Sequence, residues 1–278
     1  MSKLPIASIV ESVVDWLEEY CAFLFDFLAL IIEGTVDVFS AVFHFIPPLL
    51  LAVLLAALAY RLGRWPLGVF ALAGLLLIQN LELWDGMIDT LALVMTSAVL
   101  SIVFGLPVGI LCAKRPSVSN VMTPMLDFMQ TMPAFVYLIP AVAFFGLGVV
   151  PGVIASVIFS VPPTIRLTNL GIRQVPAELT EAADSFGSTA GQKLFKVQLP
   201  LAMPTIMAGI NQTIMLSLSM VVIAAMIGAQ GLGTEVYRAV TQLKIGEGFE
   251  AGLAVVIVAI LLDRLTQKAI KTRGKSSK

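Results

Sequence analysis

Hydrophobic residues occur in long runs along the chain, and short polar segments separate the runs. The apolar runs lie at about residues 45–60, 66–81, 90–112, 122–147, 151–168, 203–228 and 249–264. About 20 consecutive apolar residues form a helix long enough to cross the hydrocarbon core of a bilayer. The pattern therefore predicts an all-α polytopic membrane helical bundle with about seven spans.

The N-terminal segment, residues 1–44, has a different pattern, in which polar and apolar positions share a helical period. Its acidic residues stay near one helical face and are Glu11, Asp15, Glu18, Asp26, Glu33 and Asp37. The apolar positions between them include Val14, Leu17, Phe25, Leu28 and Ile32. This spacing predicts an amphipathic helix that lies along the membrane interface instead of crossing it. The acidic face is solvated, braces the bundle or docks an external partner, and the pattern leaves these alternatives open.

A polar connector, residues 176–200, interrupts the apolar pattern between the fifth and sixth runs. Its apolar stripe at helical spacing consists of Leu179, Ala182, Ala183 and Phe186. Gly187 follows as the expected C-cap, because glycine adopts a positive φ at little cost. Thr189 and Gln192 then match a capping box that opens a second short helix. The connector is therefore predicted to be a helical hairpin, which either docks in another protein or packs back on its own bundle.

The composition supports a membrane protein and limits the other classes. Of the 278 residues, 58% are hydrophobic and only 13% are charged, whereas soluble proteins carry about 25% charged residues. The mean hydropathy is +0.96, and the predicted spans leave no room for a soluble catalytic domain. No basic segment followed by an apolar run opens the chain, so a cleaved signal peptide is not expected. Cys21 and Cys112 lie in different apolar contexts, so neither a disulfide nor a metal site is expected.

Most basic residues fall on one side of the predicted spans. If the basic tail, residues 268–278, is cytoplasmic, 14 of the 17 Lys and Arg residues share that side. Only Lys3, Arg238 and Lys244 lie on the other side. Because basic residues near span ends favour the cytoplasm, we expect an extracytoplasmic N-terminus and a cytoplasmic C-terminus. The polar connector is then cytoplasmic as well.

The charged side chains near the membrane are expected at span ends. Asp127 lies near the inner start of the fourth run, where it caps a helix, snorkels or contacts the polar connector. Asp263 and Arg264 are expected to anchor the last span at the interface. His44 precedes the first span and is expected to be a hydrogen-bonded interfacial residue.

The sixth run carries polar side chains that lipid tolerates poorly. Asn211, Gln212 and Ser217 must face other helices or water. They either join helices by hydrogen bonds or line a translocation path. Phe135 and Tyr137 are aromatic candidates for the same path, with core packing as the alternative.

Prolines divide several runs. The candidate kink and hinge positions are Pro133, Pro140, Pro162, Pro163 and Pro204. A proline removes a backbone donor and can bend its helix, and bends at similar depth can hinge a transporter. Prolines are also simply common in membrane helices.

The polar connector carries the most specific motif of the chain. The stretch "EAADSFGSTAGQKLFKVQLP", residues 181–200, resembles the EAA loop, EAA-x3-G-x9-I-x-LP, of integral membrane subunits of binding-protein-dependent ABC importers. Val197 stands where that loop usually has isoleucine. The stretches "TMPAFVYLIPAVAFFGLG" and "FKVQLPLAMPTIMAGINQTIM" are similar to permeases of the glycine betaine, proline betaine, carnitine and choline branch. The resemblance covers roughly residues 85–267, and the first 80 residues fit only loosely.

This resemblance implies a type I ABC importer permease (MetI-like) fold in a bacterial inner membrane. It divides the chain into an extracytoplasmic amphipathic segment (1–44), two accessory spans (45–84), the permease core (85–267) and a basic cytoplasmic tail (268–278). The EAA loop, about residues 176–200, would be the coupling helix received by the ATPase subunit. The residues that it places at this coupling site are Glu178, Glu181, Ala182, Ala183, Phe186, Gly187, Leu199 and Pro200.

The resemblance also implies the partners. These are two copies of an ATPase subunit, a second copy of the permease and an extracytoplasmic substrate-binding protein, with no nucleic acid. The chain itself lacks G-x4-G-K-[ST], so it cannot hydrolyse ATP by the P-loop route. ATP–Mg would be bound by the partner ATPase, and this chain would be a non-catalytic permease without a cofactor or metal.

Two alternative functions differ from the ABC permease in their source of energy. A gradient-driven secondary transporter predicts ionisable residues in mid-membrane and inverted repeats, and neither is evident in the sequence. A structural membrane scaffold would need no energy at all.

Overall fold

The computed structural model of the chain describes residues 6–275, and within that range it contains helices and no strands. The first half comprises α1 (Ile6–Phe45), α2 (Pro48–Asn80), α3 (Trp84–Lys114), α4 (Pro116–Thr131), η1 (Ala134–Tyr137) and α5 (Leu138–Phe145). The second half comprises α6 (Val149–Arg173), α7 (Ala177–Ser185), α8 (Ala190–Lys193), η2 (Leu194–Gln198), α9 (Leu199–Ser219), α10 (Val221–Ala225), α11 (Leu232–Thr241) and α12 (Ile245–Lys275). The all-α prediction is confirmed for the described residues.

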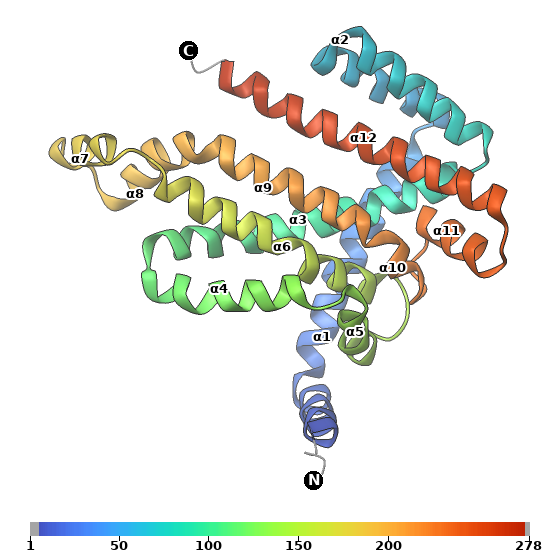
Figure 1. Cartoon of the computed structure of the whole chain (residues 1–278), viewed down its shortest axis with the longest axis horizontal. Helices are drawn as coiled ribbons and strands as arrows, with labels where there is room; N and C mark the ends of the chain where they lie inside the picture. The colour runs from blue at the N-terminus through green and yellow to red at the C-terminus, as the bar shows by residue number, and fades with distance from the viewer. Residues whose placement is uncertain (1–5, 276–278) are drawn as a thin grey trace.

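Five of the described helical segments are long and apolar enough to cross a membrane, and a sixth crossing exists if the bent pair α4 and η1–α5 counts as one. In Figure 1, α3, α4, α6, α9 and α12 run in broadly similar directions, and α1 runs across them. The apolar runs at 90–112, 151–168 and 249–264 each lie within one of these helices. The differences from seven simple spans concern α2 and the α4–α5 pair.

The helix α2 is a hairpin and not a single straight element. Arg64 breaks it with φ 63° and ψ −171°. A Cβ added to Gly68 would lie 2.8 Å from the Cβ of Tyr60 and 3.4 Å from the carbonyl oxygen of Ala56, although 12 residues of straight helix span about 18 Å. The two arms therefore pack side by side and correspond to the apolar runs 45–60 and 66–81. Each arm is about 24 Å long, somewhat less than the hydrocarbon core.

The predicted fourth span, residues 122–147, is wrong as a single helix. Its two parts, α4 and η1–α5, meet at an angle of 108°. Met132 and Pro133 are extended at the break, with ψ of 135° and 134°. Proline lacks the N–H that would continue α4, and its ring disfavours helical geometry in the preceding residue. Pro133 therefore ends a helix instead of bending one.

The other candidate hinge prolines lie inside continuous helices. Pro162 and Pro163 are buried within α6, Pro140 is the third residue of α5, and Pro204 lies within α9. No helix break accompanies any of the four. A hinge role for them stays a prediction.

The packing centre of the bundle is the contact of α3, α6 and α9. Gly109 of α3 meets α6 so closely that an added Cβ would lie 2.6 Å from Thr168 Cβ and 2.8 Å from the Ile165 carbonyl oxygen. Gly105, one turn earlier, meets Thr164 in the same way. Glycine at both positions therefore lets threonine side chains of α6 pack directly against the backbone of α3.

The helix α1 has the amphipathic pattern expected of it. All six acidic residues of the predicted face are exposed. Phe25 stacks on Phe144 of α5 with ring centroids 4.4 Å apart, and Ile32 is buried in the main core. α1 therefore braces the bundle through α3, α5 and α6.

The α3–α6 contact yields a stability prediction. Replacing Gly109 with Ala should lower the free energy of unfolding by about 1–3 kcal/mol, because a backbone carbonyl blocks the added methyl group and the helices must separate. Gly252→Ala is the matched control, since no atom lies within 4 Å of its added Cβ. Thermal unfolding of the two purified variants in detergent measures the difference. A Gly109→Ala protein as stable as the wild type would contradict this account of the contact.

Candidate functional site

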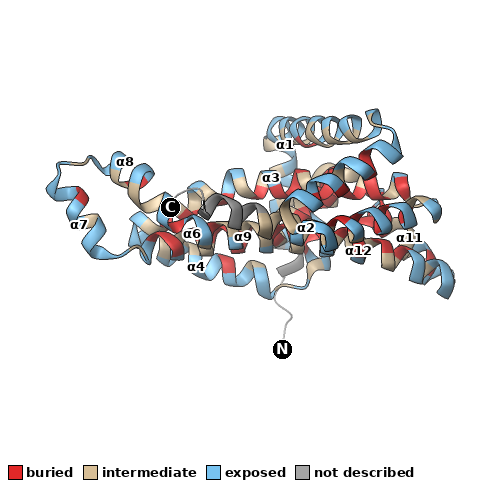
Figure 2. Cartoon of the chain, turned by 90° about the horizontal axis from the view of Figure 1, so that it is seen from above, coloured by how far each residue is buried: buried red, intermediate tan, exposed pale blue. Residues whose placement is uncertain are grey.

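The predicted polar connector forms a small helical hairpin, α7–α8, that projects beyond the bundle. Figure 1 shows it at the far left, and Figure 2 shows that most of its residues are exposed. Pro176 precedes α7 as its N-cap, and φ −53° with ψ 134° directs the chain away from α6. Short α8 and the wide-turn helix η2 then lead into α9.

The turn between α7 and α8 depends on Gly187. Its φ is +73°, as the C-cap prediction requires. The Gly187 N–H donates to the Asp184 carbonyl at 2.9 Å, and the Ser188 N–H donates to the Ala183 carbonyl at 3.0 Å. This pair of bonds is a Schellman motif, which satisfies the last carbonyls of the helix. A residue with a Cβ would be strained here by its backbone, even though space around the position is open.

The second helix of the hairpin is held by a capping box and an ion pair. The Gln192 N–H donates to Thr189 Oγ1 at 3.3 Å, and the Thr189 N–H donates to Gln192 Oε1 at 3.0 Å. The predicted capping box is therefore confirmed. Lys193 Nζ lies 2.7 Å from both carboxylate oxygens of Asp184, which ties α8 to α7.

The apolar stripe of α7 is largely uncovered. Ala183 is buried at 9% exposure, whereas Leu179 is 44% and Phe186 is 90% exposed. Glu178 and Glu181 are also exposed. The alternative of a loop folded back on its own bundle therefore does not describe α7, because this chain covers only Ala183 of the stripe.

The base of the hairpin is joined firmly to the bundle. Leu194 of η2 is 4% exposed and packs with Ile172 of α6 and with Ala202 and Ile206 of α9. η2 is one wide turn in which the Leu199 N–H donates to the Leu194 carbonyl. It ends two residues before Pro200, which has no N–H to continue a regular helical hydrogen-bond pattern. Leu199 and Pro200, the last two residues of the predicted coupling motif, thus begin α9.

The candidate path residues lie in different surroundings. Ser217 is fully buried, and its Oγ donates to Ser160 Oγ of α6 at 3.0 Å. Thr213, one turn earlier, donates to the Ser160 carbonyl at 2.8 Å. Ser101 of α3 lies 3.2 Å from the same Ser160 hydroxyl. Ser217 therefore joins helices through hydroxyl groups in this structure, as the alternative interpretation expected.

The two amides of α9 differ from each other. Asn211 Nδ2 donates to Asp263 Oδ1 of α12 at 2.9 Å, and Gln267 Nε2 donates to the same oxygen at 2.7 Å. Asp263 is thus bonded between helices and is more than an interface anchor. Gln212 is exposed.

The two aromatic candidates for the translocation path, Phe135 and Tyr137, also differ in their surroundings. Phe135 is 53% exposed on η1. Tyr137 is buried, and its hydroxyl donates to the Met129 carbonyl of α4. Tyr137 therefore stabilises the bend after α4, and a path role for Phe135, Gln212 or Asn211 stays a prediction.

The sequence did not indicate one ion pair within the bundle. Arg166 Nη2 of α6 donates to Asp127 Oδ1 of α4 at 2.6 Å. The partners are 39 residues apart in sequence, so no local spacing could have paired them. Asp127 lies eleven residues after the start of α4, and Arg166 lies seven residues before the end of α6. The expected place of charged residues at span ends stays a prediction.

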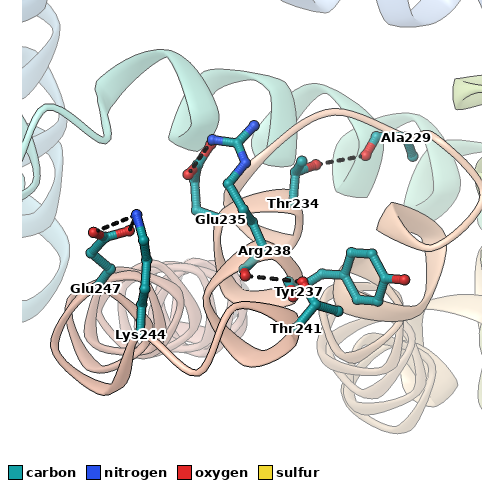
Figure 3. Close-up of polar contacts among 8 residues, drawn as sticks. All are labelled: Ala229, Thr234, Glu235, Tyr237, Arg238, Thr241, Lys244 and Glu247. Carbon is teal, nitrogen blue, oxygen red and sulfur yellow. Dashed lines mark hydrogen bonds and ion pairs between the residues drawn. The ribbon is translucent and has the colours of Figure 1, made fainter.

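The opposite end of the bundle is rich in acidic groups. A cavity of about 360 Å³ between the α2–α3 turn, α11 and the start of α12 is lined by Glu82, Asp85, Glu235, Glu247 and Glu250. Figure 3 shows that two of these carboxylates have basic partners, Arg238 at 3.1 Å and Lys244 at 2.9 Å. The described residues contain no group of three His, Cys, Asp or Glu side chains arranged to hold a metal ion.

Comparisons with known proteins agree on one family. The family model of the "Binding-protein-dependent transport system inner membrane component" matches residues 105–267. The chain is 56% identical over 276 residues to the glycine betaine transport system permease protein OpuAB of Bacillus subtilis, covering 99% of this chain and 98% of the relative. It is 58% identical over 277 residues to the glycine betaine/carnitine transport permease protein GbuB of Listeria monocytogenes, covering 98% of each.

Solved structures support the same fold at lower identity. An inward-facing structure of the MetNI methionine ABC transporter aligns with a TM-score of 0.62 at 21% sequence identity, and the alignment covers 68% of this chain and 95% of that one. The chain is thus similar in fold to a transporter subunit of known architecture.

Proposed function

Because the chain belongs to the family of binding-protein-dependent transport system inner membrane components, we propose that it is the permease subunit of an ATP-driven importer of glycine betaine or a related quaternary-ammonium osmoprotectant. Relatives that match nearly the whole chain are named as glycine betaine permeases. A family of binding-protein-dependent transport components also favours ATP-driven import over the gradient-driven alternative.

The α7–α8 hairpin supports the coupling role. It has an exposed apolar stripe of small and aromatic side chains, a rigid turn at Gly187 and a firmly packed base at Leu194. An amphipathic helix with these properties fits a groove on another protein. The stripe with Glu178 and Glu181 would contact the ATPase subunit, which would bind ATP–Mg.

The proposed mechanism follows from the connections of the hairpin. Closure of two ATPase subunits on ATP would displace α7, and η2 would pass that displacement to α9 and α6 through Leu194. Two copies of the permease would form the path between them and open it outward to a substrate-binding protein. After hydrolysis the path would open inward and release the solute.

The proposed orientation puts the N-terminus outside the cell and the C-terminus in the cytoplasm. Figure 1 supports it, because the α3–α4 turn, the α7–α8 hairpin and the C-terminal end of α12 all lie toward the left. These segments contain Lys114, Arg115 and Lys193, with Lys196 following in η2, and α11 lies toward the other end. Basic residues on one side of the bundle are typical of the cytoplasmic side.

Uptake by a reconstituted complex tests the proposal. The permease, its ATPase subunit and its binding protein are placed in liposomes, and labelled glycine betaine is added outside with ATP at the ATPase side. We expect accumulation that requires ATP hydrolysis and continues when ion gradients are collapsed. Accumulation that follows an ion gradient and ignores ATP would overturn the proposal in favour of a secondary transporter.

Gly187 yields a prediction about coupling. In Gly187→Val the β-branched residue must occupy a positive φ, so the turn should rearrange and α7 should lose its orientation. We expect uptake to fall at least tenfold, with a much smaller loss of ATP hydrolysis by the complex. The uptake-to-hydrolysis ratio is the measurement.

Gly191→Val is the matched control for that variant. Gly191 lies in α8, its φ is not in the left-handed region, and no atom lies within 4 Å of an added Cβ. Its uptake-to-hydrolysis ratio should stay within about twofold of the wild type, since valine lowers helix propensity only slightly. Full uptake by assembled Gly187→Val would refute the coupling role of this turn.

A further inference from the structure

The Asp127–Arg166 ion pair joins two helices of the candidate membrane spans, α4 and α6. Arg173 at the end of α6 donates to the Cys112 carbonyl near the end of α3 at 2.9 Å, so the two helices end at a similar level. Arg166 is seven residues before that end, about 10 Å along the helix. Asp127 is eleven residues after Pro116, about 16 Å along α4. Both residues therefore lie about two to three turns inside helices of the candidate membrane spans.

Both members of the pair are accessible from outside this chain. The side chains of Arg166 and Asp127 are 39% and 57% exposed. A single N–H···O bond at 2.6 Å joins them, so one carboxylate oxygen and several guanidinium donors are unused. Charges at this depth do not face acyl chains, because desolvation without protein or water around them is prohibitively unfavourable.

The helix α4 shows which direction the pair faces. Leu126, Met122 and Met129 pack on the bundle with Val161 and Ile165 of α6. The remaining surface divides into two flanks, one polar and one apolar. The exposed polar side chains are Asn120, Thr123, Asp127, Gln130 and Thr131, and the exposed large apolar ones are Val121, Met125 and Phe128.

The two flanks are angularly separate. At about 100° per residue, the polar positions fall within about 100° of arc, and the apolar positions fall within about 60° on the other side. The apolar flank can contact lipid acyl chains without an unfavourable desolvation cost. The polar flank, with an ion pair at its centre, must face water or another protein subunit, which is the environment of a transport path.

We propose that Asp127 and Arg166 form a binding site for the zwitterionic solute within the membrane, a proposal that rests on the proposed function. In glycine betaine one methylene separates the quaternary ammonium from the carboxylate, so the two charges are as close as those of the ion pair. The Asp127 carboxylate faces the ammonium, which has no N–H and is held by charge alone. The Arg166 guanidinium takes the solute carboxylate, which matches its planar donors.

Solute binding leaves every charge of the site paired with an opposite charge. In the empty site each side chain neutralises the other, and in the occupied site each is neutralised by the opposite charge of the solute. No unpaired charge is created in a region of low polarity, which keeps the site weak and reversible. Choline has the ammonium but no carboxylate, so it would leave Arg166 unpaired and bind less well.

Binding to the complex without its binding protein tests the site directly. The permease–ATPase complex is placed in lipid nanodiscs, and the dissociation constants of glycine betaine and choline are measured by NMR saturation transfer. We expect the wild type to prefer glycine betaine. Asp127→Asn should weaken both ligands at least tenfold. Arg166→Gln should weaken glycine betaine at least tenfold but choline less than threefold, which removes the preference.

Two further variants separate charge from folding. The double variant Asp127→Asn with Arg166→Gln retains an amide–amide hydrogen bond and leaves no lone charge, so it should assemble and still fail to bind glycine betaine. Glu235→Gln with Arg238→Gln removes an ion pair of similar exposure on α11 (Figure 3) and should bind like the wild type.

The outcomes distinguish this inference from the proposed function. Absent ATP-driven uptake by the wild type would overturn the function and the site together. Normal wild-type uptake, combined with no glycine betaine binding in nanodiscs or with unchanged binding and ligand preference in the double variant, would overturn the site alone.

Discussion

The packing of Leu194 between α6 and α9 is the contact on which the transport account depends. A helix that projects from a membrane bundle can move that bundle only if its base is rigidly attached. Leu194 is buried against Ile172, Ala202 and Ile206, and the wide turn of η2 joins it to α9 without a flexible linker. Gly187 and the Asp184–Lys193 ion pair fix the other end of the hairpin. The hairpin is therefore rigidly joined to α6 and α9, so that a displacement of α7 would move both helices.

The bilayer imposes the second constraint, because polar groups within it need partners. Ser101, Ser160, Thr213 and Ser217 hydrogen-bond one another between α3, α6 and α9, where glycines allow close approach. Asp263 accepts from Asn211 and Gln267 at the α9–α12 contact. The Asp127–Arg166 pair is different, since its charges are paired but both side chains remain accessible beside the polar flank of α4.

Much of this architecture could be predicted from the sequence. Apolar runs located the long helices, and the spacing of acidic residues predicted α1. The motif that begins at Glu181 predicted the hairpin together with its positive φ and capping box, because these depend on local residue chemistry. What the sequence did not predict, or left open, depends on how the helices meet. The break at Pro133 is a 108° turn that a continuous apolar run conceals, and the choice between hydrogen bonding and a path role for Ser217 depended on a serine 57 residues away. The Asp127–Arg166 ion pair joins residues 39 positions apart, so no local pattern indicated it.

Photo-crosslinking from position 186 in the assembled complex tests the central claim most directly. The exposed Phe186 is replaced by benzoyl-phenylalanine, and the same replacement at Phe249, which is 72% exposed near the start of α12, is the control. The account predicts a crosslink from position 186 to the ATPase subunit and none from position 249. A crosslink from position 186 to the extracytoplasmic binding protein, or no crosslink to the ATPase in an active complex, would contradict the coupling role of the α7–α8 hairpin.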